Sequence, residues 1–173
     1  MQPSAPSPHK SPHADACLVA VDCAVLTVSD TRTPATDKSG QLMQTQLTAA
    51  GHWVCHYQIL KDEPAQIAAL VQQLVLRPDI KAILLNGGTG IAPRDTTYDA
   101  IVPLLTKELP GFGEIFRQLS YAEIGSRAIA SRAIAGVIDT TLLFSVPGST
   151  KAVALALETL ILPELRHLTG LLS

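Results

Sequence analysis

Apolar runs alternate along the chain with segments that have the apolar spacing of helices. The continuous apolar run at 24–28 and the largely apolar segment 80–85 predict strands buried in a parallel sheet, and residues 141–146 predict a further strand. Residues 53–60 predict a fourth strand, and residues 129–138 are expected to pair with 141–146 as a β-hairpin. The helical segments fall between these strands, so the order predicts an α/β fold with a mostly parallel sheet and helices on both of its faces.

The expected helices carry recognisable start and stop signals. Asp37 offers an N-cap to a helix that Gly51 ends, and Pro64 opens the next helix. A helix after Thr96 contains Pro103, which should kink it or delay its start. Three more helical segments are marked by the apolar face of residues 112–119, by a Ser149 cap and by Pro163.

Composition narrows the class of protein. The 173 residues are 47% hydrophobic and carry a net charge of −2, which excludes general disorder and a broad basic field for nucleic acid. We expect residues 1–16, rich in proline and serine, to form a disordered tail, and residues 17–173 to form one domain. No apolar run is long enough to span a membrane, and three cysteines without metal-ligand spacing favour reduced thiols in the cytoplasm.

Polar residues follow each of the expected parallel strands. They are Ser29 and Asp30, Asp62, the segment 86–95, and the segment 147–149. Ligands of open α/β sheets bind beyond the carboxyl ends of the strands, so these loops are the first candidates for a site.

The glycine loop Gly87-Gly88-Thr89-Gly90 is the most informative of these segments. It can bring backbone amides close to an anion, although a plain tight turn is the alternative. Asp95 could hold Mg²⁺ against phosphate oxygens or could cap the helix that follows it, and Asp62 and Asp30 share that ambiguity. For His52 and His56, four residues apart, an ordinary surface or edge role is favoured over metal binding.

Six ordered motifs together resemble a known family. They are Leu26 to Thr31, Asp37 to Gly40, Gly87 to Gly90 with Pro93-Arg94-Asp95, Pro110 to Glu114, Ser131 to Ala133, and Pro147 to Ser149. Over about residues 20 to 168 the chain resembles the molybdenum cofactor biosynthesis family of molybdopterin adenylyltransferases, and its MoaB branch more than its MogA branch. Asn86 departs from the threonine common before these glycines in the family.

The resemblance implies a three-layer α/β/α fold and a Mg²⁺-dependent transfer of AMP from ATP to the terminal phosphate of molybdopterin. It implies catalytic and metal-binding roles for Asp62 and Asp95 and phosphate contacts from the glycine loop. The residues that it assigns to the pterin pocket are Ser29, Asp30, Ser131, Gly148 and Ser149. It further implies a homotrimer or homohexamer and a separate molybdate-insertion protein that receives the product.

A non-catalytic relative that only binds or carries molybdopterin is the alternative. It differs from the leading hypothesis in one property, the formation of an AMP–pterin product. A general nucleotide-binding protein with another substrate is the third hypothesis.

Overall fold

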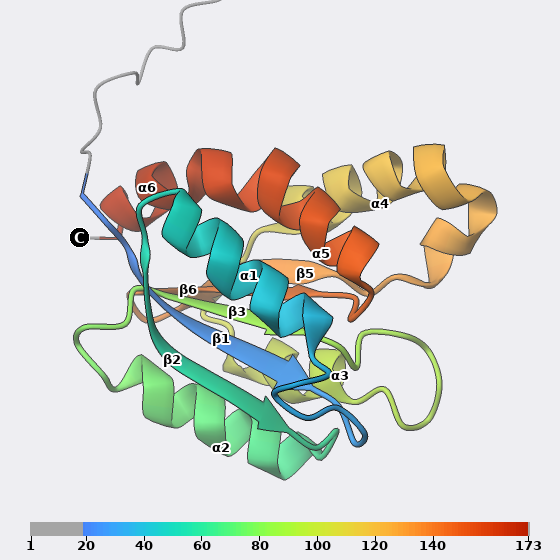
Figure 1. Ribbon diagram of the computed structural model, residues 1–173, viewed down its shortest axis with the longest axis horizontal. Helices are drawn as coiled ribbons and strands as arrows, with labels where there is room; N and C mark the ends of the chain where they lie inside the picture. The colour runs from blue at the N-terminus through green and yellow to red at the C-terminus, as the bar shows by residue number, and fades with distance from the viewer. Residues whose placement is uncertain (1–18, 173) are drawn as a thin grey trace, which may run out of the picture.

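A computed structural model describes residues 19–172, so the predicted tail over residues 1–16 lies outside the described residues. One six-stranded sheet runs through the fold in the order β2-β1-β3-β6-β5-β4 (Figure 1). Its strands are β1 (Asp22–Val28), β2 (Trp53–Leu60), β3 (Ala82–Asn86), β4 (Lys107–Glu108), β5 (Ile134–Ile138) and β6 (Thr141–Val146). Strands β2, β1, β3 and β6 are parallel, whereas β5 runs antiparallel to both β6 and β4.

Helices cover both faces of this sheet. One face carries α1 (Lys38–Ala49), α4 (Pro110–Ile124), α5 (Thr150–Ala156) and α6 (Leu162–Gly170). The opposite face carries α2 (Pro64–Val75) and α3 (Thr97–Ile101) (Figure 1). The predicted three-layer α/β/α class and the β5–β6 hairpin are therefore confirmed.

The continuous apolar runs arise because each central strand supplies two cores. In β1, Val25 packs in the core beneath α1 and α5, while its neighbours Ala24 and Leu26 pack in the core beneath α2. In β3, Leu84 and Leu85 divide between the two cores in the same way. Successive side chains point to opposite faces of a strand, so burial on both faces requires apolar residues at every position.

Most of the local helix signals operate as expected. The Asp37 carboxylate accepts a hydrogen bond from the Gly40 amide at 2.9 Å, which caps α1. Ser149 caps α5 through a 3.2 Å bond from the Ala152 amide. Gly51 follows α1 with a φ of 80°, a conformation that glycine adopts without strain.

Two predicted boundaries are wrong. The strand expected at 129–138 begins only at Ile134, because its partner β6 ends at Val146 and Ile134 is already opposite Ser145. Residues 125–130 instead form a 3₁₀ turn. The helix after Thr96 stops at Ile101 and continues as a 3₁₀ turn over Val102–Leu104, because Pro103 cannot donate a backbone hydrogen bond.

The last helical region is continuous from α5 to α6 through a π-helical turn, Leu157–Ile161. Its apolar residues are largely used inside the protein: Leu157, Ile161 and Leu165 are fully buried. The apolar residues of this C-terminal helical region are therefore mostly part of the core. Among the described residues, every helix is too short or too polar to cross a membrane.

The strand order has a switch point between β1 and β3, where open α/β sheets characteristically form a ligand crevice. The chain leaves β1 towards α1 on one face of the sheet and leaves β3 towards α3 on the other face. Loops that diverge in this way at the carboxyl ends of parallel strands leave room for a ligand.

Candidate functional site

The glycine loop begins directly at the end of β3. Gly87 and Gly88 have φ values of 101° and 63°, which side chains larger than glycine rarely adopt. A Cβ atom at Gly87 would lie 2.2 Å from the carbonyl oxygen of Val28, so the loop also packs against the end of β1. Both features require glycine at this position.

The loop presents unused backbone donors. The Gly87 amide bonds to the Val146 carbonyl at 3.0 Å, but no residue within 19–172 accepts a hydrogen bond from the amides of Gly88, Thr89 or Gly90. Three consecutive free amides next to positive-φ glycines form a concavity suited to phosphate oxygens. The anion-binding interpretation of this loop therefore gains support over a plain turn.

Arg132, in the segment before β5, bonds to the glycine loop and to the turn that follows it. Its guanidinium donates to the Gly90 carbonyl at 2.8 Å and to the Asp95 carbonyl at 2.7 Å. Its backbone amide donates to the Thr89 carbonyl at 3.1 Å. It also contacts both oxygens of the Asp99 carboxylate and lies 4.9 Å from the centre of the Tyr98 ring. The loop shape thus depends on a side chain from the segment before β5.

The two predicted acidic residues border the same loop. One oxygen of Asp62 accepts hydrogen bonds from the Thr96 amide at 3.0 Å and from the Thr96 hydroxyl at 2.6 Å. One oxygen of Asp95 accepts from the Ala92 amide at 3.0 Å. Asp95 therefore closes the turn 92–95, and its predicted alternative role as the cap of α3 is wrong.

Asp30 joins the loop after β1 to the loops after β2 and β3. Its carboxylate accepts a hydrogen bond from the Asp62 amide at 3.2 Å and pairs with Arg94. The neighbouring Ser29 hydroxyl accepts hydrogen bonds from the Thr31 and Arg32 amides, which shapes the start of the same loop. These contacts bring Asp30, Asp62 and the segment after the glycine loop together.

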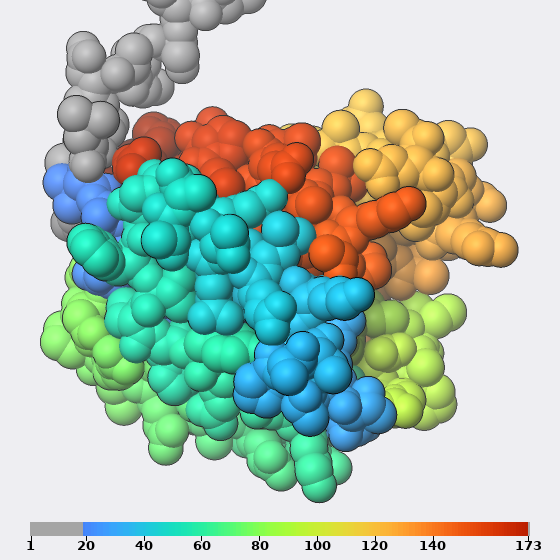
Figure 2. All heavy atoms as spheres, in the orientation of Figure 1, coloured from blue at the N-terminus to red at the C-terminus, as the bar shows by residue number. Residues whose placement is uncertain are grey.

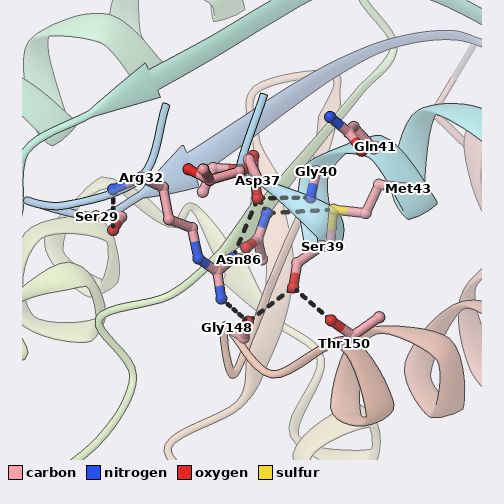
Figure 3. A network of polar contacts seen from close by, with 12 residues as sticks. Ser29, Arg32, Asp37, Ser39, Gly40, Gln41, Met43, Asn86, Gly148 and Thr150 are labelled. Carbon is pink, nitrogen blue, oxygen red and sulfur yellow. Dashed lines mark hydrogen bonds and ion pairs between the residues drawn. The ribbon is translucent and has the colours of Figure 1, made fainter. Parts of the chain in front are cut away.

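A second network connects the loop after β1 with the loop after β6 (Figure 3). The Arg32 guanidinium lies 3.1 Å from the buried Asp37 carboxylate and donates to the Gly148 carbonyl at 2.8 Å. The Ser39 hydroxyl donates to the same Gly148 carbonyl at 2.8 Å. Gly148 packs so closely on Gly87 that a Cβ at Gly148 would lie 3.1 Å from the Gly87 Cα. This network therefore reaches the base of the glycine loop.

Asp37 is ionised at neutral pH. Its burial favours the neutral form, but hydrogen bonds from Thr27, Gly40 and Tyr57 and the nearby charge of Arg32 outweigh burial and lower its pKa. Burial, together with the hydrogen bond to the Asp37 carboxylate and the charge of that group, raises the pKa of Tyr57 to about 12. The phenol thus remains a hydrogen-bond donor across the physiological range.

Asn86 extends this network beneath the site. Its amide donates to the Thr27 hydroxyl at 2.8 Å and lies 3.7 Å from the Met43 sulfur (Figure 3). The Asn86 Oδ1 atom is buried, and no residue of the described chain donates a hydrogen bond to it. With asparagine in place of the expected threonine, the polar contacts of this side chain lie below the glycine loop, and the loop keeps its positive-φ glycines.

The predicted site residues gather at one end of the molecule but do not all share one hollow. In Figure 2 the loop after β1, the loop after β3 and the start of α5 lie at the same end of the protein. Ser131 lines a cleft of about 290 Å³ beside α4, whereas Ser149 lines a separate hollow of about 240 Å³ between α4 and α5. Ser29 and Gly148 are joined through Arg32, whereas Asp30 contacts Asp62 and Arg94.

The donor set is compatible with Mg²⁺. Asp62 and Asp95 each retain one carboxylate oxygen that accepts no hydrogen bond from residues 19–172. No group of three His, Cys, Asp or Glu side chains in this range could hold a metal ion by itself. Mg²⁺ is commonly bound by one or two carboxylates together with substrate phosphates and water, so an ion that arrives with a polyphosphate fits these residues.

The two histidines have structural surroundings. The buried His52 ring accepts a hydrogen bond from the Val21 amide at 3.1 Å, and burial followed by the charge of Arg166 lowers its pKa. His56 lies within β2, at the edge of the sheet. His56 thus has the edge position expected of it, whereas the surface role expected of His52 is wrong, because its ring is buried and bonded to the Val21 amide.

Sequence reasoning missed the side chains that hold the loops. Arg32, Arg132 and Tyr57 were not among the predicted site residues, and Asp37 was predicted only as a helix cap. A usable signal was present, since Arg132 lies inside a quoted motif and Arg32 directly follows another. Apart from the contact of Arg32 with Asp37, however, their side-chain partners lie 20 to 116 residues away along the chain, and local patterns do not reveal such pairs.

Known proteins match the chain over most of its length. A family model described as a probable molybdopterin binding domain matches residues 24–167. Molybdenum cofactor biosynthesis protein B of Halalkalibacterium halodurans is 60% identical over 148 residues, 85% of this chain and 87% of that protein.

Solved structures agree. A crystal structure of molybdenum cofactor biosynthesis protein B has a TM-score of 0.87 at 51% identity and covers 89% of this chain and 96% of its own. The tungsten cofactor synthesizing protein MoaB of Pyrococcus furiosus has a TM-score of 0.77 at 36% identity, with 86% and 94% covered. The chain therefore belongs to the molybdopterin-binding-domain family of molybdenum cofactor biosynthesis proteins, and within it resembles MoaB.

Proposed function

We propose that this protein transfers AMP from ATP to the terminal phosphate of molybdopterin and releases pyrophosphate. One observation carries the proposal: glycine-loop amides without an acceptor in the described chain lie next to two carboxylates, Asp62 beside Gly88 and Asp95 beside Gly90, and each carboxylate has an available oxygen. Membership in a family that acts in molybdenum cofactor biosynthesis supplies the substrate class.

This reaction requires a site that positions the two phosphate-bearing substrates and stabilises their negative charge. A phosphate oxygen of molybdopterin attacks the α-phosphorus of ATP, a new P–O bond forms, and the bond to the departing pyrophosphate breaks. The attacking oxygen is already anionic at neutral pH, so the reaction needs no base to remove a proton. The loop amides of Gly88, Thr89 and Gly90 can hold phosphate oxygens in place as negative charge shifts to the leaving group.

Asp62 and Asp95 would hold Mg²⁺ at the edge of the same loop. When bound, the ion neutralises charge between phosphate groups that would otherwise repel each other. The hydrogen bonds to Thr96 and Ala92 fix one oxygen of each carboxylate, which keeps the other oxygen at a defined position.

The test is an adenylylation assay with purified molybdopterin and ATP. We expect pyrophosphate release only when molybdopterin is present, and a fall in rate of about 100-fold in Asp62→Asn and in Asp95→Asn. Asp79→Asn is the matched control, because Asp79 is an exposed carboxylate whose partner Arg77 is also exposed. Wild-type rates in both site variants would remove the roles given to these residues.

A second candidate function is molybdopterin binding without AMP transfer. The observation in its favour is that both carboxylates already have structural hydrogen bonds, at Thr96 and Ala92, so their presence does not require catalysis. Calorimetry that detects molybdopterin binding alongside a null adenylylation assay would select this function.

The wider proposal concerns what happens around the reaction. The adenylylated pterin would pass to a separate molybdate-insertion protein, and use of ATP agrees with the cytoplasmic location expected from the sequence. We also propose a homotrimer or homohexamer. The exposed apolar side chains of α4, which are Ile115, Tyr121 and Ile124, support a covered surface there.

A further inference from the structure

Two arginines hold two different parts of the crevice. Arg132 bonds to the glycine loop and to the turn that follows it, on the side proposed to hold phosphates. Arg32 bonds to Gly148, and its amide to Ser29, both on the side assigned to the pterin. Within residues 19–172 no hydrogen bond or shared acceptor joins the two guanidinium groups, so each can be removed without directly disturbing the other.

The Arg32 contacts form a bridge between segments distant in sequence. Its guanidinium lies between the Asp37 carboxylate, which is fully buried, and the Gly148 carbonyl (Figure 3). Asp37 is itself fixed by the Gly40 amide at 2.9 Å and by the Tyr57 hydroxyl at 2.8 Å. The arginine fork is thus anchored at one end to the start of α1 and holds the turn before α5 with the other.

Removal of the guanidinium would leave Gly148 with weaker support. Among the described residues, only the Ser39 hydroxyl would still donate to its carbonyl, and Ser39 also lies 3.3 Å from the Thr150 hydroxyl. The turn could then move relative to Gly87, on which Gly148 packs. A planar fork with two separate acceptors fixes a position better than a flexible ammonium group can.

We propose that Arg32, anchored by Asp37, is a positioning residue that sets the Ser29 and Gly148 side of the crevice for the pterin, while Arg132 sets the glycine loop for the nucleotide phosphates. The assignment of ligands to the two sides rests on the proposed function. The separate positioning of two loop groups rests on the contacts alone.

The experiment compares Arg32→Met with Arg132→Met in the full chain. Amide hydrogen exchange without ligand reports the loops through their hydrogen-bonded amides. Arg32→Met should speed exchange at Ala152 and Val153, which bond to Ser149, and Arg132→Met should speed it at Asp95 and Thr97, which bond to Ala92 and Gly88. Calorimetry with purified molybdopterin and with a non-hydrolysable ATP analogue reports the ligands. Arg32→Met should raise the Kd for molybdopterin about ten-fold and the Kd for the analogue less than about two-fold, and Arg132→Met should show the reverse preference.

Two further variants separate positioning from general damage. Arg77→Met removes an exposed arginine that pairs with Asp79, so both Kd values should remain at the wild-type level. Arg32→Lys retains the charge beside Asp37 but cannot reach both acceptors in the same fork geometry. Arg32→Lys should have the unfolding midpoint of the wild type, while its Kd for molybdopterin should lie between those of the wild type and Arg32→Met.

The outcomes distinguish the two levels of the proposal. Equal changes in both Kd values for Arg32→Met, or unchanged exchange at Ala152 and Val153, would overturn the positioning role. A wild-type protein that binds molybdopterin but makes no AMP–pterin product would remove the proposed activity and leave the role of Arg32 in binding intact. If the wild type bound no molybdopterin, the pterin assignment would be overturned, and the exchange data alone would decide whether Arg32 positions the Gly148 turn.

Discussion

Replacement of Asp37 by asparagine should lower the free energy of unfolding by about 3 kcal/mol. Asn is a good helix N-cap, so the bond from the Gly40 amide is retained. The variant loses the ion pair with Arg32. It also loses a charged acceptor for the hydrogen bond that the Tyr57 hydroxyl donates. Breaking a buried ion pair costs about 3–5 kcal/mol, and the partly exposed Arg32 can regain some hydration, which puts the loss near the lower end of that range.

Urea unfolding measures this loss. For a typical slope of about 2 kcal/mol per molar urea, the midpoint should fall by about 1.5 M with an unchanged slope. Tyr57→Phe, which removes one neutral donor, should cost about 1 kcal/mol. A change below about 0.5 kcal/mol in Asp37→Asn would refute the reasoning, because it would mean that the buried network contributes almost nothing.

The difference in unfolding free energy between wild type and Asp37→Asn should depend on pH. The pKa of Asp37 is lower in the folded than in the unfolded chain, so its stabilising contribution is complete above the unfolded value of about 3.9. That contribution is lost as the pH falls through the lower folded pKa. The difference in unfolding free energy between wild type and Asp37→Asn should therefore stay constant from about pH 5 to 7 and shrink below about pH 4.

Three further predictions concern other parts of the protein. Gly87→Ala should lower the free energy of unfolding in urea by at least about 2 kcal/mol, because the new methyl group would overlap the carbonyl at the end of β1. Gly111 has open space around it, so Gly111→Ala should leave the free energy of unfolding unchanged. The pKa of both the Cys23 and the Cys55 thiol is raised, chiefly by burial, but of these two residues Cys55 is exposed and Cys23 is buried. Peptide mapping after alkylation at pH 8 should therefore show Cys55 labelled in the folded protein and Cys23 labelled only on unfolding. Light scattering should give a multiple of 18.3 kDa, and Ile124→Glu should lower it; a wild-type monomer would contradict the expected oligomer.

Local patterns predicted the layers of the fold well, because they depend on neighbouring residues. The continuous apolar run at 24–28 reflects burial on both faces of β1, and Asp37 and Ser149 cap helices as their residue types favour. The strand expected from 129 was wrong for a non-local reason. Its first residues have no partner beyond the end of β6, and Arg132 is instead drawn to the glycine loop.

The same distinction applies to the site. The glycine loop and the strand-end carboxylates could be predicted, because their position after parallel strands indicates a common edge of the sheet. The contact of Arg32 with Gly148 spans 116 residues, and no spacing rule predicts it. The short strand β4 was missed because its two residues, Lys107 and Glu108, are exposed and charged and carry no strand pattern.

The central claim is that this chain makes an AMP–pterin product. The most direct measurement is mass analysis of a reaction that contains the wild-type protein, purified molybdopterin, ATP and Mg²⁺. We predict adenylyl-molybdopterin and pyrophosphate in equal amounts, and neither product when molybdopterin is left out. Molybdopterin recovered unchanged from a protein that demonstrably binds it would contradict the claim and identify the protein as a binding member of its family.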